Sequence, residues 1–128
     1  KPERLKIQET FKHHGYETED LTENDMAKLH IRHMVGGRLN SNEVERIYRF
    51  EFPERPGALL NFLNRMGQKW NISLFHYRNH GSAFGRVLCG FQIPQALFPT
   101  FNKFLKSQGY EYSEETLNAA YNKFLHKL

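Results

Sequence analysis

The stretch FPERPGALLNFLNRMG, residues 52–67, predicts where a strand ends and a helix begins. Upstream of it, Tyr48, Phe50 and Phe52 alternate with charged residues, which is the period-2 pattern of a strand. Pro56 suits the first helical position, because a helix leaves the N–H of that residue unpaired anyway. Apolar residues then recur at helical spacing, namely Ala58, Leu59, Phe62, Leu63 and Met66.

The same two patterns continue along the chain. They predict strands over 70–78 and 86–93, a helix over 98–108 that stops at Gly109, and a short fourth strand over 110–112. The order from residue 44 to 112 is therefore strand, helix, strand, strand, helix, strand. That order is typical of the α+β ferredoxin-like βαββαβ fold, an antiparallel four-stranded sheet with two helices on one face. A tail helix follows.

The first 43 residues have a different pattern. Residues 3–14 predict the end of an amphipathic helix, Gly15 is a natural helix stop, and Tyr16 begins a short extended piece. Residues 22–33 predict a further helix, capped by Thr22 or Asn24. Residues 35–43 are polar and contain glycine, which makes them the best internal boundary.

The two ends of the chain resemble each other. FKHHGYETEDLTEN, which ends at Asn24, matches FLKSQGYEYSEETLN, which ends at Asn118, when Gly15 is aligned with Gly109 at an offset of 94 residues. We favour a repeat, in which the chain begins inside the last helix of one βαββαβ copy and continues through a whole second copy. The alternative is coincidence between two helix ends, which often share glycine and polar residues.

Composition limits the possible classes of function. A chain of 128 residues makes one domain or slightly more, and its net charge of +4 is spread out, which gives little support to nucleic-acid binding. No apolar run approaches the ~20 residues of a membrane span, and no signal peptide is visible. The chain does not begin with Met, so we expect a piece of a longer protein. The single cysteine, Cys89, fits a reducing cytoplasm and predicts a small buried side chain.

Metal and catalytic constellations are weak. His30 and His33 form an HxxH pattern without a further ligand at suitable spacing, and no Ser-His-Asp or paired-carboxylate pattern stands out. We therefore predict no metal site and no catalytic residue in this chain.

Two motifs point to a family. FEFPERPGALLNFL, with WNISLFHYRNHG and GRVL, resembles the C-terminal regulatory region of biosynthetic threonine deaminase (threonine dehydratase, threonine ammonia-lyase). DMAKLHIRHMVGGR resembles the segment that joins that family's two ACT-like subdomains. The resemblance implies that residues 1–37 are the C-terminal part of a first ACT-like module with a connecting helix, 44–113 a complete second module, and 114–128 the tail helix.

The resemblance also implies a role in control. In the family a pyridoxal-phosphate (PLP) catalytic domain precedes the modules, whereas this chain has no Gly-rich phosphate loop or Schiff-base lysine motif and is expected to hold no cofactor. Family regulation is inhibition by isoleucine, opposed by valine, in a tetramer. The expected partners are therefore isoleucine or valine, the catalytic domain of the parent enzyme, and further copies through the ACT-like modules, with no nucleic acid or membrane.

An amino-acid effector needs donors for its carboxylate, acceptors for its ammonium group and an apolar pocket. The turn of Arg55, Pro56, Gly57 and Ala58 offers N–H groups at a helix N-terminus. Leu59 and Leu63 are candidates for the apolar wall, and Asn71 and Tyr77 for further polar contacts. The resemblance points to the same place, because ACT modules hold amino acids at the first turn of their first helix. The plain alternative is a strand-to-helix turn followed by core leucines.

Two other classes of function remain open. RRM domains share the βαββαβ topology and bind RNA through exposed aromatic residues on their central strands, but RVLCGFQI lacks the aromatic-rich pattern. A dimerisation module without a ligand would pair its sheet edges.

Overall fold

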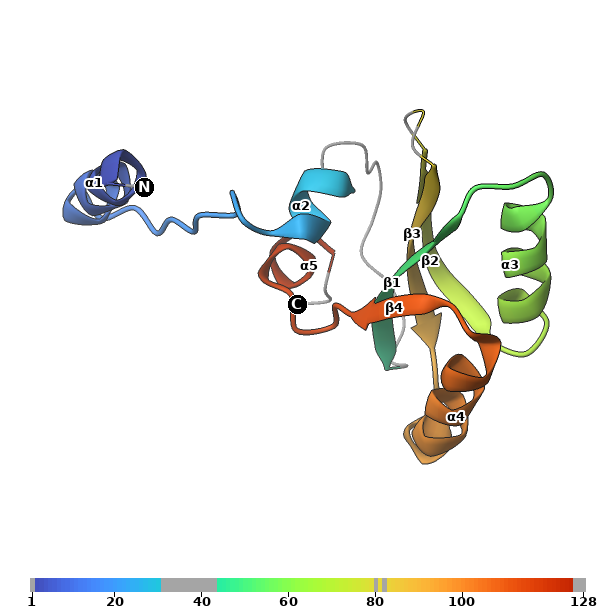
Figure 1. The fold of residues 1–128 in the computed structure, drawn as a ribbon. Helices are drawn as coiled ribbons and strands as arrows, with labels where there is room; N and C mark the ends of the chain where they lie inside the picture. Colours follow the sequence, from blue (N-terminus) through green and yellow to red (C-terminus); the bar gives the residue numbers. More distant parts are fainter. Residues whose placement is uncertain (1, 31–43, 80, 82, 126–128) are drawn as a thin grey trace.

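The computed structural model describes residues 2–30, 44–79, 81 and 83–125. Figure 1 shows a sheet with helices on both sides and one helix set apart. The elements are α1 (Pro2–His13), α2 (Asp25–Leu29), β1 (Glu45–Pro53), α3 (Ala58–Gly67), β2 (Asn71–Arg78), β3 (Phe84–Gln92), the 3₁₀ helix η2 (Gln95–Leu97), α4 (Phe98–Gln108), β4 (Glu111–Glu114) and α5 (Ala119–Phe124).

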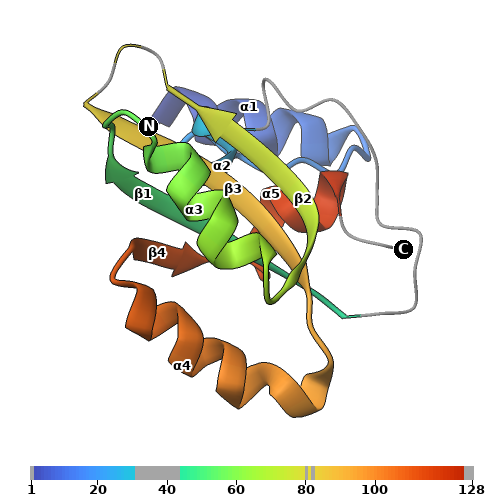
Figure 2. The same ribbon diagram turned by 90° about the vertical axis from the view of Figure 1, so that its right-hand side faces the viewer.

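The sheet confirms the predicted fold class. Its strand order is β2-β3-β1-β4, and all neighbours are antiparallel. β1 pairs with β3 from Glu45 opposite Gln92 to Pro53 opposite Phe84. Helices α3 and α4 lie on one face of the sheet (Figure 2), which we call the first face. β1 and β3 are the central strands, so their side chains are covered from both sides.

The main core lies between the first face and helices α3 and α4. The alternation in β1 places its aromatic side chains on this face, since successive residues of a strand point to opposite sides. Phe50 contacts Phe62 of α3 edge-to-face, with ring centroids 4.9 Å apart. Cys89 is buried in this core, which confirms the prediction of a small buried side chain. Burial raises the pKa of its thiol. The buried members are Tyr48, Phe50, Phe52, Phe62, Met66, Val87, Cys89, Phe91, Ile93, Phe101 and Leu105.

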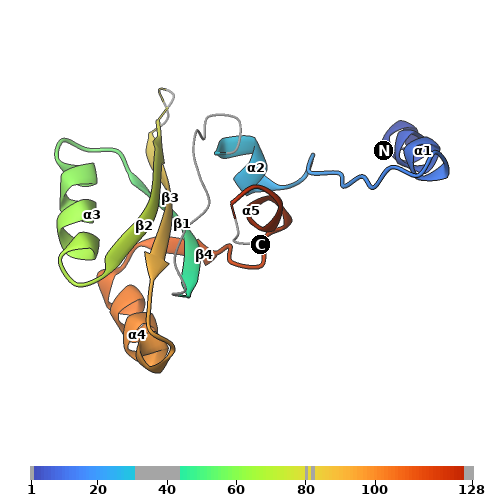
Figure 3. The ribbon, with the colours of Figure 1, turned by 180° about the vertical axis from the view of Figure 1, so that it is seen from behind.

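Helices α2 and α5 cover the opposite face of the sheet, the second face (Figures 1 and 3). The pattern predicted both helices but not where they lie. Ile47 of β1 and Leu88 of β3 are fully buried there together with Met26, Ala120 and Tyr121. An RRM leaves this face of its central strands open for bases. The second face is therefore occupied, and the RNA-binding alternative does not fit the fold.

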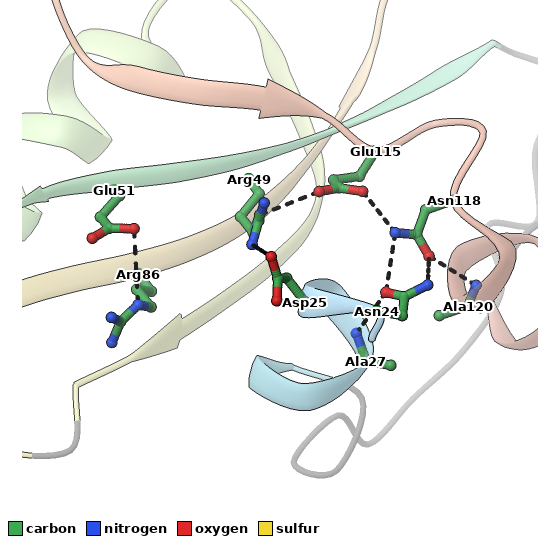
Figure 4. Close-up of polar contacts among 9 residues, drawn as sticks. All are labelled: Asn24, Asp25, Ala27, Arg49, Glu51, Arg86, Glu115, Asn118 and Ala120. Atoms are coloured by element: carbon green, nitrogen blue, oxygen red, sulfur yellow. Dashed lines mark hydrogen bonds and ion pairs between the residues drawn. The ribbon is translucent and has the colours of Figure 1, made fainter. Parts of the chain in front are cut away.

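Polar contacts fasten α2 to the second face (Figure 4). Arg49 of β1 lies between two carboxylates, with its Nε 3.2 Å from Glu115 and its Nη1 3.7 Å from Asp25 of α2. The side chain of Asn24 accepts a hydrogen bond from the Ala27 N–H at 3.0 Å, so Asn24 is the N-cap of α2. Of the two predicted caps, Asn24 is confirmed and Thr22 is wrong.

Other boundary predictions have mixed outcomes. Gly15 and Gly109 both have positive φ, 81° and 72°, and end α1 and α4 as predicted. The segment after Gly15 is not a paired strand in the described structure, and residues 16–21 lie outside helix and strand. A strand needs a neighbour to bond to, and the sheet described here ends at β4. The predicted linker over 35–43 lies outside the described residues.

His30, which ends α2, is fully buried against the second face. Its Nδ1 lies 2.7 Å from Nδ1 of His76 on β2. Burial lowers the pKa of His30 to about 3, and the charges of His76, Arg49, Arg78 and Arg86 act in the same direction. His30 is therefore neutral near pH 7, and one imidazole of the pair donates while the other accepts.

This burial predicts a pH-dependent stability. Between pH 6.5, the ordinary pKa of histidine, and about 3, the unfolded chain binds a proton at His30 that the folded chain does not. The free energy of unfolding should therefore fall as the pH falls through this window, by up to ~1.4 kcal/mol per pH unit. Urea unfolding at pH 7, 6 and 5 measures it. A His30→Gln variant should have a shallower pH dependence, and equal slopes in the two proteins would contradict the assignment.

Candidate functional site

The link between β1 and α3 is a tight turn. The Ala58 N–H donates to the Arg55 carbonyl at 2.9 Å, and Gly57 has φ 79° and ψ 0°. These values are typical of a type II turn with Pro56 at its second position and Gly57 at its third. The prediction that Pro56 is the first helical residue is wrong, because the turn precedes the helix and α3 begins at Ala58.

The N-terminus of α3 carries no side-chain cap. The first N–H groups of a helix lack partners within the helix, and the helix dipole adds a partial positive charge there. Pro56 has no N–H, and that of Ala58 bonds within the turn. The N–H groups of Leu59 and Leu60 therefore remain as donors for an anion. The number of free donors is smaller than the sequence predicts, because the Ala58 N–H is used within the turn.

A surface pocket of about 550 Å³ opens on one side of this turn. It brings together six of the eight predicted effector-binding residues, and it adds an acidic residue, Glu54, and an apolar residue, Leu60. Its lining is Glu54, Arg55, Pro56, Gly57, Ala58, Leu59, Leu60 and Tyr77.

Tyr77 and Glu54 form the polar wall of this pocket. The Tyr77 hydroxyl donates to Glu54 Oε2 at 2.5 Å, and this hydrogen bond is the main reason that the pKa of Tyr77 is raised. Both side chains pack over Gly85 of β3, where an added Cβ would lie 2.7 Å from Glu54 Oε2 and 3.2 Å from the Tyr77 ring. Gly85 therefore makes room for the pair. A glycine within a strand is a known signal of such close approach.

A second pocket, of about 690 Å³, lies on the other side of the turn. It extends to the junction of α4 and β4, where Gln108, Gly109, Tyr110 and Glu111 line it. Residues 55–58 line both pockets. The turn is thus exposed on two sides, with mixed polar and apolar surroundings.

Two predicted residues lie elsewhere. Leu63 packs against the main core and does not line either pocket at the turn. Asn71 lies at the opposite end of β2 from Tyr77, roughly 20 Å away along the strand. Its amide donates to Gln92, and it lines a separate hollow with residues 67–70 and Ile72. One module does not bring Asn71 to the turn.

Other kinds of site are not evident in the described part of the chain. Among these residues, no group of three or more His, Cys, Asp or Glu side chains could hold a metal ion. None of the described helices has the length and hydrophobicity needed to cross a membrane.

The antiparallel sheet with α3 and α4 on one face defines the class of ACT-like modules with the ferredoxin-type fold. Comparison with known families is more specific. Residues 36–125 match the model of the C-terminal regulatory domain of threonine dehydratase, and the chain belongs to this family.

Relatives agree with the family match. The chain is 52% identical over 123 residues to the biosynthetic L-threonine dehydratase IlvA of Burkholderia multivorans, which covers 96% of the chain and 24% of that protein. It is 50% identical to the Escherichia coli enzyme of the same name, with the same coverage. The mitochondrial threonine dehydratase of Saccharomyces cerevisiae is 50% identical over 111 residues, 87% of the chain and 19% of that protein.

The chain spans about a quarter of the length of its first bacterial relatives. The matched part is a regulatory domain, as the sequence motifs indicated, and not the part of the family that carries PLP. The predicted role in control is therefore confirmed at the level of the domain.

The turn generates a stability prediction. Gly57→Ala should destabilise the fold by roughly 1–2 kcal/mol, because alanine is strained at φ 79°. No atom lies within 4 Å of the added Cβ, so the loss would be conformational and not steric. Gly67→Ala is the control: it lies at the end of α3 without positive φ, and its Cβ would meet Ile72 Cδ1 at an ordinary 3.6 Å. Urea unfolding should show a loss only for Gly57→Ala.

Proposed function

We propose that this chain senses branched-chain amino acids for a threonine dehydratase. Isoleucine or valine binds at the turn before α3 and thereby controls the conversion of threonine to 2-oxobutanoate and ammonia by the PLP-dependent catalytic domain of the parent enzyme. The observation that carries the proposal is the pocket at this turn, where an uncapped helix N-terminus, the Glu54 carboxylate and leucine side chains meet.

The pocket offers one partner for each part of the ligand. The N–H groups of Leu59 and Leu60 and the positive end of the α3 dipole suit the carboxylate of an amino acid. Glu54 already accepts a hydrogen bond from Tyr77 and has a second carboxylate oxygen for the ammonium group. The side chains of Leu59 and Leu60 provide apolar surface for a branched side chain. Leu63 and Asn71 have no contact role in this arrangement.

The regulatory mechanism follows from linkage. An effector changes the activity of a distant catalytic domain only if it binds two arrangements of the modules with different affinity, typically by ~1–3 kcal/mol. We assign residues 1–37 to the end of a first ACT-like module, 44–113 to the second and 114–128 to the tail. The modules belong to a cytoplasmic homo-oligomer in which the parent's catalytic domain is the partner that receives the signal.

Binding can be measured directly. Calorimetric titration of this chain with isoleucine and valine should give saturable heat, whereas threonine, which carries a hydroxyl in place of a methyl group, and a short RNA pool should not. Absence of binding by isoleucine and valine both here and in the full-length enzyme would contradict the proposal. Binding of RNA would contradict the regulatory function proposed for this chain.

A substitution tests the position of the pocket. In the full-length enzyme, Leu59→Phe should fill the pocket and raise the isoleucine concentration for half-inhibition roughly tenfold or more. Leu97→Phe, at an exposed leucine of η2 outside the pockets at the turn, is the matched control and should leave inhibition unchanged. Undiminished inhibition in a normally folded Leu59→Phe enzyme would mean that the effector binds elsewhere.

A ligand-free dimerisation module is the second candidate. β2 is an edge strand of the sheet, and Phe75 on it is 39% exposed. Exposed edges of this kind can pair with a second copy to continue the sheet. Sedimentation with and without isoleucine separates the candidates, since a purely structural module would pair equally well in both conditions.

A further inference from the structure

Acidic residues are absent from the middle of the chain. Residues 55–110 contain seven arginines and lysines and no aspartate or glutamate, although the whole chain has 14 acidic residues. This segment runs from the turn before α3 to the residue before β4, so it includes α3, β2, β3 and α4. The positive charge is spread along the sequence, but here it is separated from the negative charge.

The fold gathers four of these cations on one surface. Helices α3 and α4 lie on the first face of the sheet (Figure 2), and their outward sides carry exposed basic residues. We call this surface the basic face. Its cations are Arg65 of α3, Lys69 just after α3, and Lys103 and Lys106 of α4. Lys103 and Lys106 are three residues apart, so they project from the same side of α4.

The cations of α3 reach toward α4. Lys69 Nζ lies 5.4 Å from the ring centroid of Phe104, which is the next residue after Lys103. Arg65 Cζ lies 5.9 Å from the ring centroid of Tyr110, which follows α4. Both distances are within the range of a cation–π contact. The basic face is therefore one continuous surface across the two helices.

No carboxylate balances the charge of the basic face. Among the described residues, the ion pairs involve none of its four cations. Helix α1, by contrast, has acidic and basic residues in alternation, as an ordinary solvated surface does. A surface of a single sign attracts a partner of the opposite sign and repels one of its own. The partner that fits the basic face is therefore acidic.

We propose that the basic face docks on an acidic surface of the parent enzyme, in the part of the enzyme that this chain lacks. About three quarters of the Burkholderia relative lies outside the matched region, so the candidate partner is large. The second face of the sheet is already covered by α2 and α5. The outward sides of α3 and α4 are exposed, and they are free to receive another part of the protein.

The aromatic rings of this surface favour a protein partner over a nucleic acid. Single-stranded nucleic acids bind where bases can stack on exposed rings. Phe104 and Tyr110 are only partly exposed, and they lie beneath Lys69 and Arg65. The basic face therefore offers charge without a stacking platform.

The position of α3 connects the basic face with the candidate effector pocket. The helix begins at the turn that lines the pocket, and Lys69 follows its last turn. An effector that shifts α3 would therefore shift Arg65 and Lys69 against the docked surface. This route for the signal rests on the proposed function, whereas the docking itself does not.

Lysine acetylation tests the docking, with Lys69 as the reporter. Mass spectrometry gives the rate of acetylation at Lys69 in this chain and in the full-length enzyme, both without isoleucine. Lys69 should react about tenfold more slowly in the full-length enzyme, because a covered amine reacts only after local opening. Equal rates in the two proteins would overturn the proposal. Equal rates together with protection of Lys69 by a short RNA would assign the basic face to a nucleic acid instead.

Charge reversal tests whether the partner is acidic. In the double variant Lys103→Glu and Lys106→Glu, Lys69 should react at nearly the same rate in the full-length enzyme as in the equally substituted chain. The double variant Lys103→Arg and Lys106→Arg keeps the charge and should keep the protection. Protection that survives the change to glutamate would overturn the proposal.

A second control places the same negative charges elsewhere. Lys6 and Lys12 are exposed on α1, outside the basic face, and Lys6→Glu with Lys12→Glu should leave Lys69 protected in the full-length enzyme. Loss of protection in this variant would also overturn the proposal, since the effect would then come from net charge alone. Calorimetry with isoleucine tests the effector pocket separately, so a failure of the pocket and a failure of the docking are distinguishable.

Discussion

The fold depends on the central pair of strands, β1 and β3, which must bury side chains on both faces. Along β1, Tyr48, Phe50 and Phe52 point to α3 and α4, while Ile47 and Arg49 point to α2 and α5. The aromatic side is a conventional core. The other side mixes a buried isoleucine with an arginine that two carboxylates neutralise. A charged side chain covered by helices needs carboxylate partners. Arg49 of β1 therefore forms ion pairs with Asp25 of α2 and with Glu115 in the segment before α5.

The site at the start of α3 depends on the same sheet. Hydrogen bonding of Glu54 N–H to the Ala83 carbonyl extends the pairing of β1 just beyond the strand, which fixes where the Pro-Gly turn begins. The turn then directs α3 across the first face and leaves its N-terminus uncapped. Gly85 on β3 provides the space in which Glu54 and Tyr77 meet. Architecture and candidate binding chemistry are therefore supplied by the same residues.

Some parts of the site could be predicted and others could not. Local chemistry indicated the turn, since proline and glycine have restricted conformations that are evident in the sequence. The sequence does not single out Glu54, because its contact with Tyr77 joins two residues that are distant along the chain. The sequence places Asn71 at the start of the strand that follows α3, and in the fold this start lies at the C-terminal end of α3, away from the turn. Membership of the same strand therefore does not show that two residues, here Asn71 and Tyr77, lie at the same end of the sheet.

The sequence by itself determined the βαββαβ order, the inward faces of the main core, and the helix stops at Gly15 and Gly109. These follow from periodicity and backbone preference, which act over a few residues. Only the tertiary structure decided that α2 and α5 close the second face, that Asn24 meets Asn118, and that His30 is buried beside His76. Those contacts join residues far apart in the chain, and no local pattern specifies which distant partner a helix will meet.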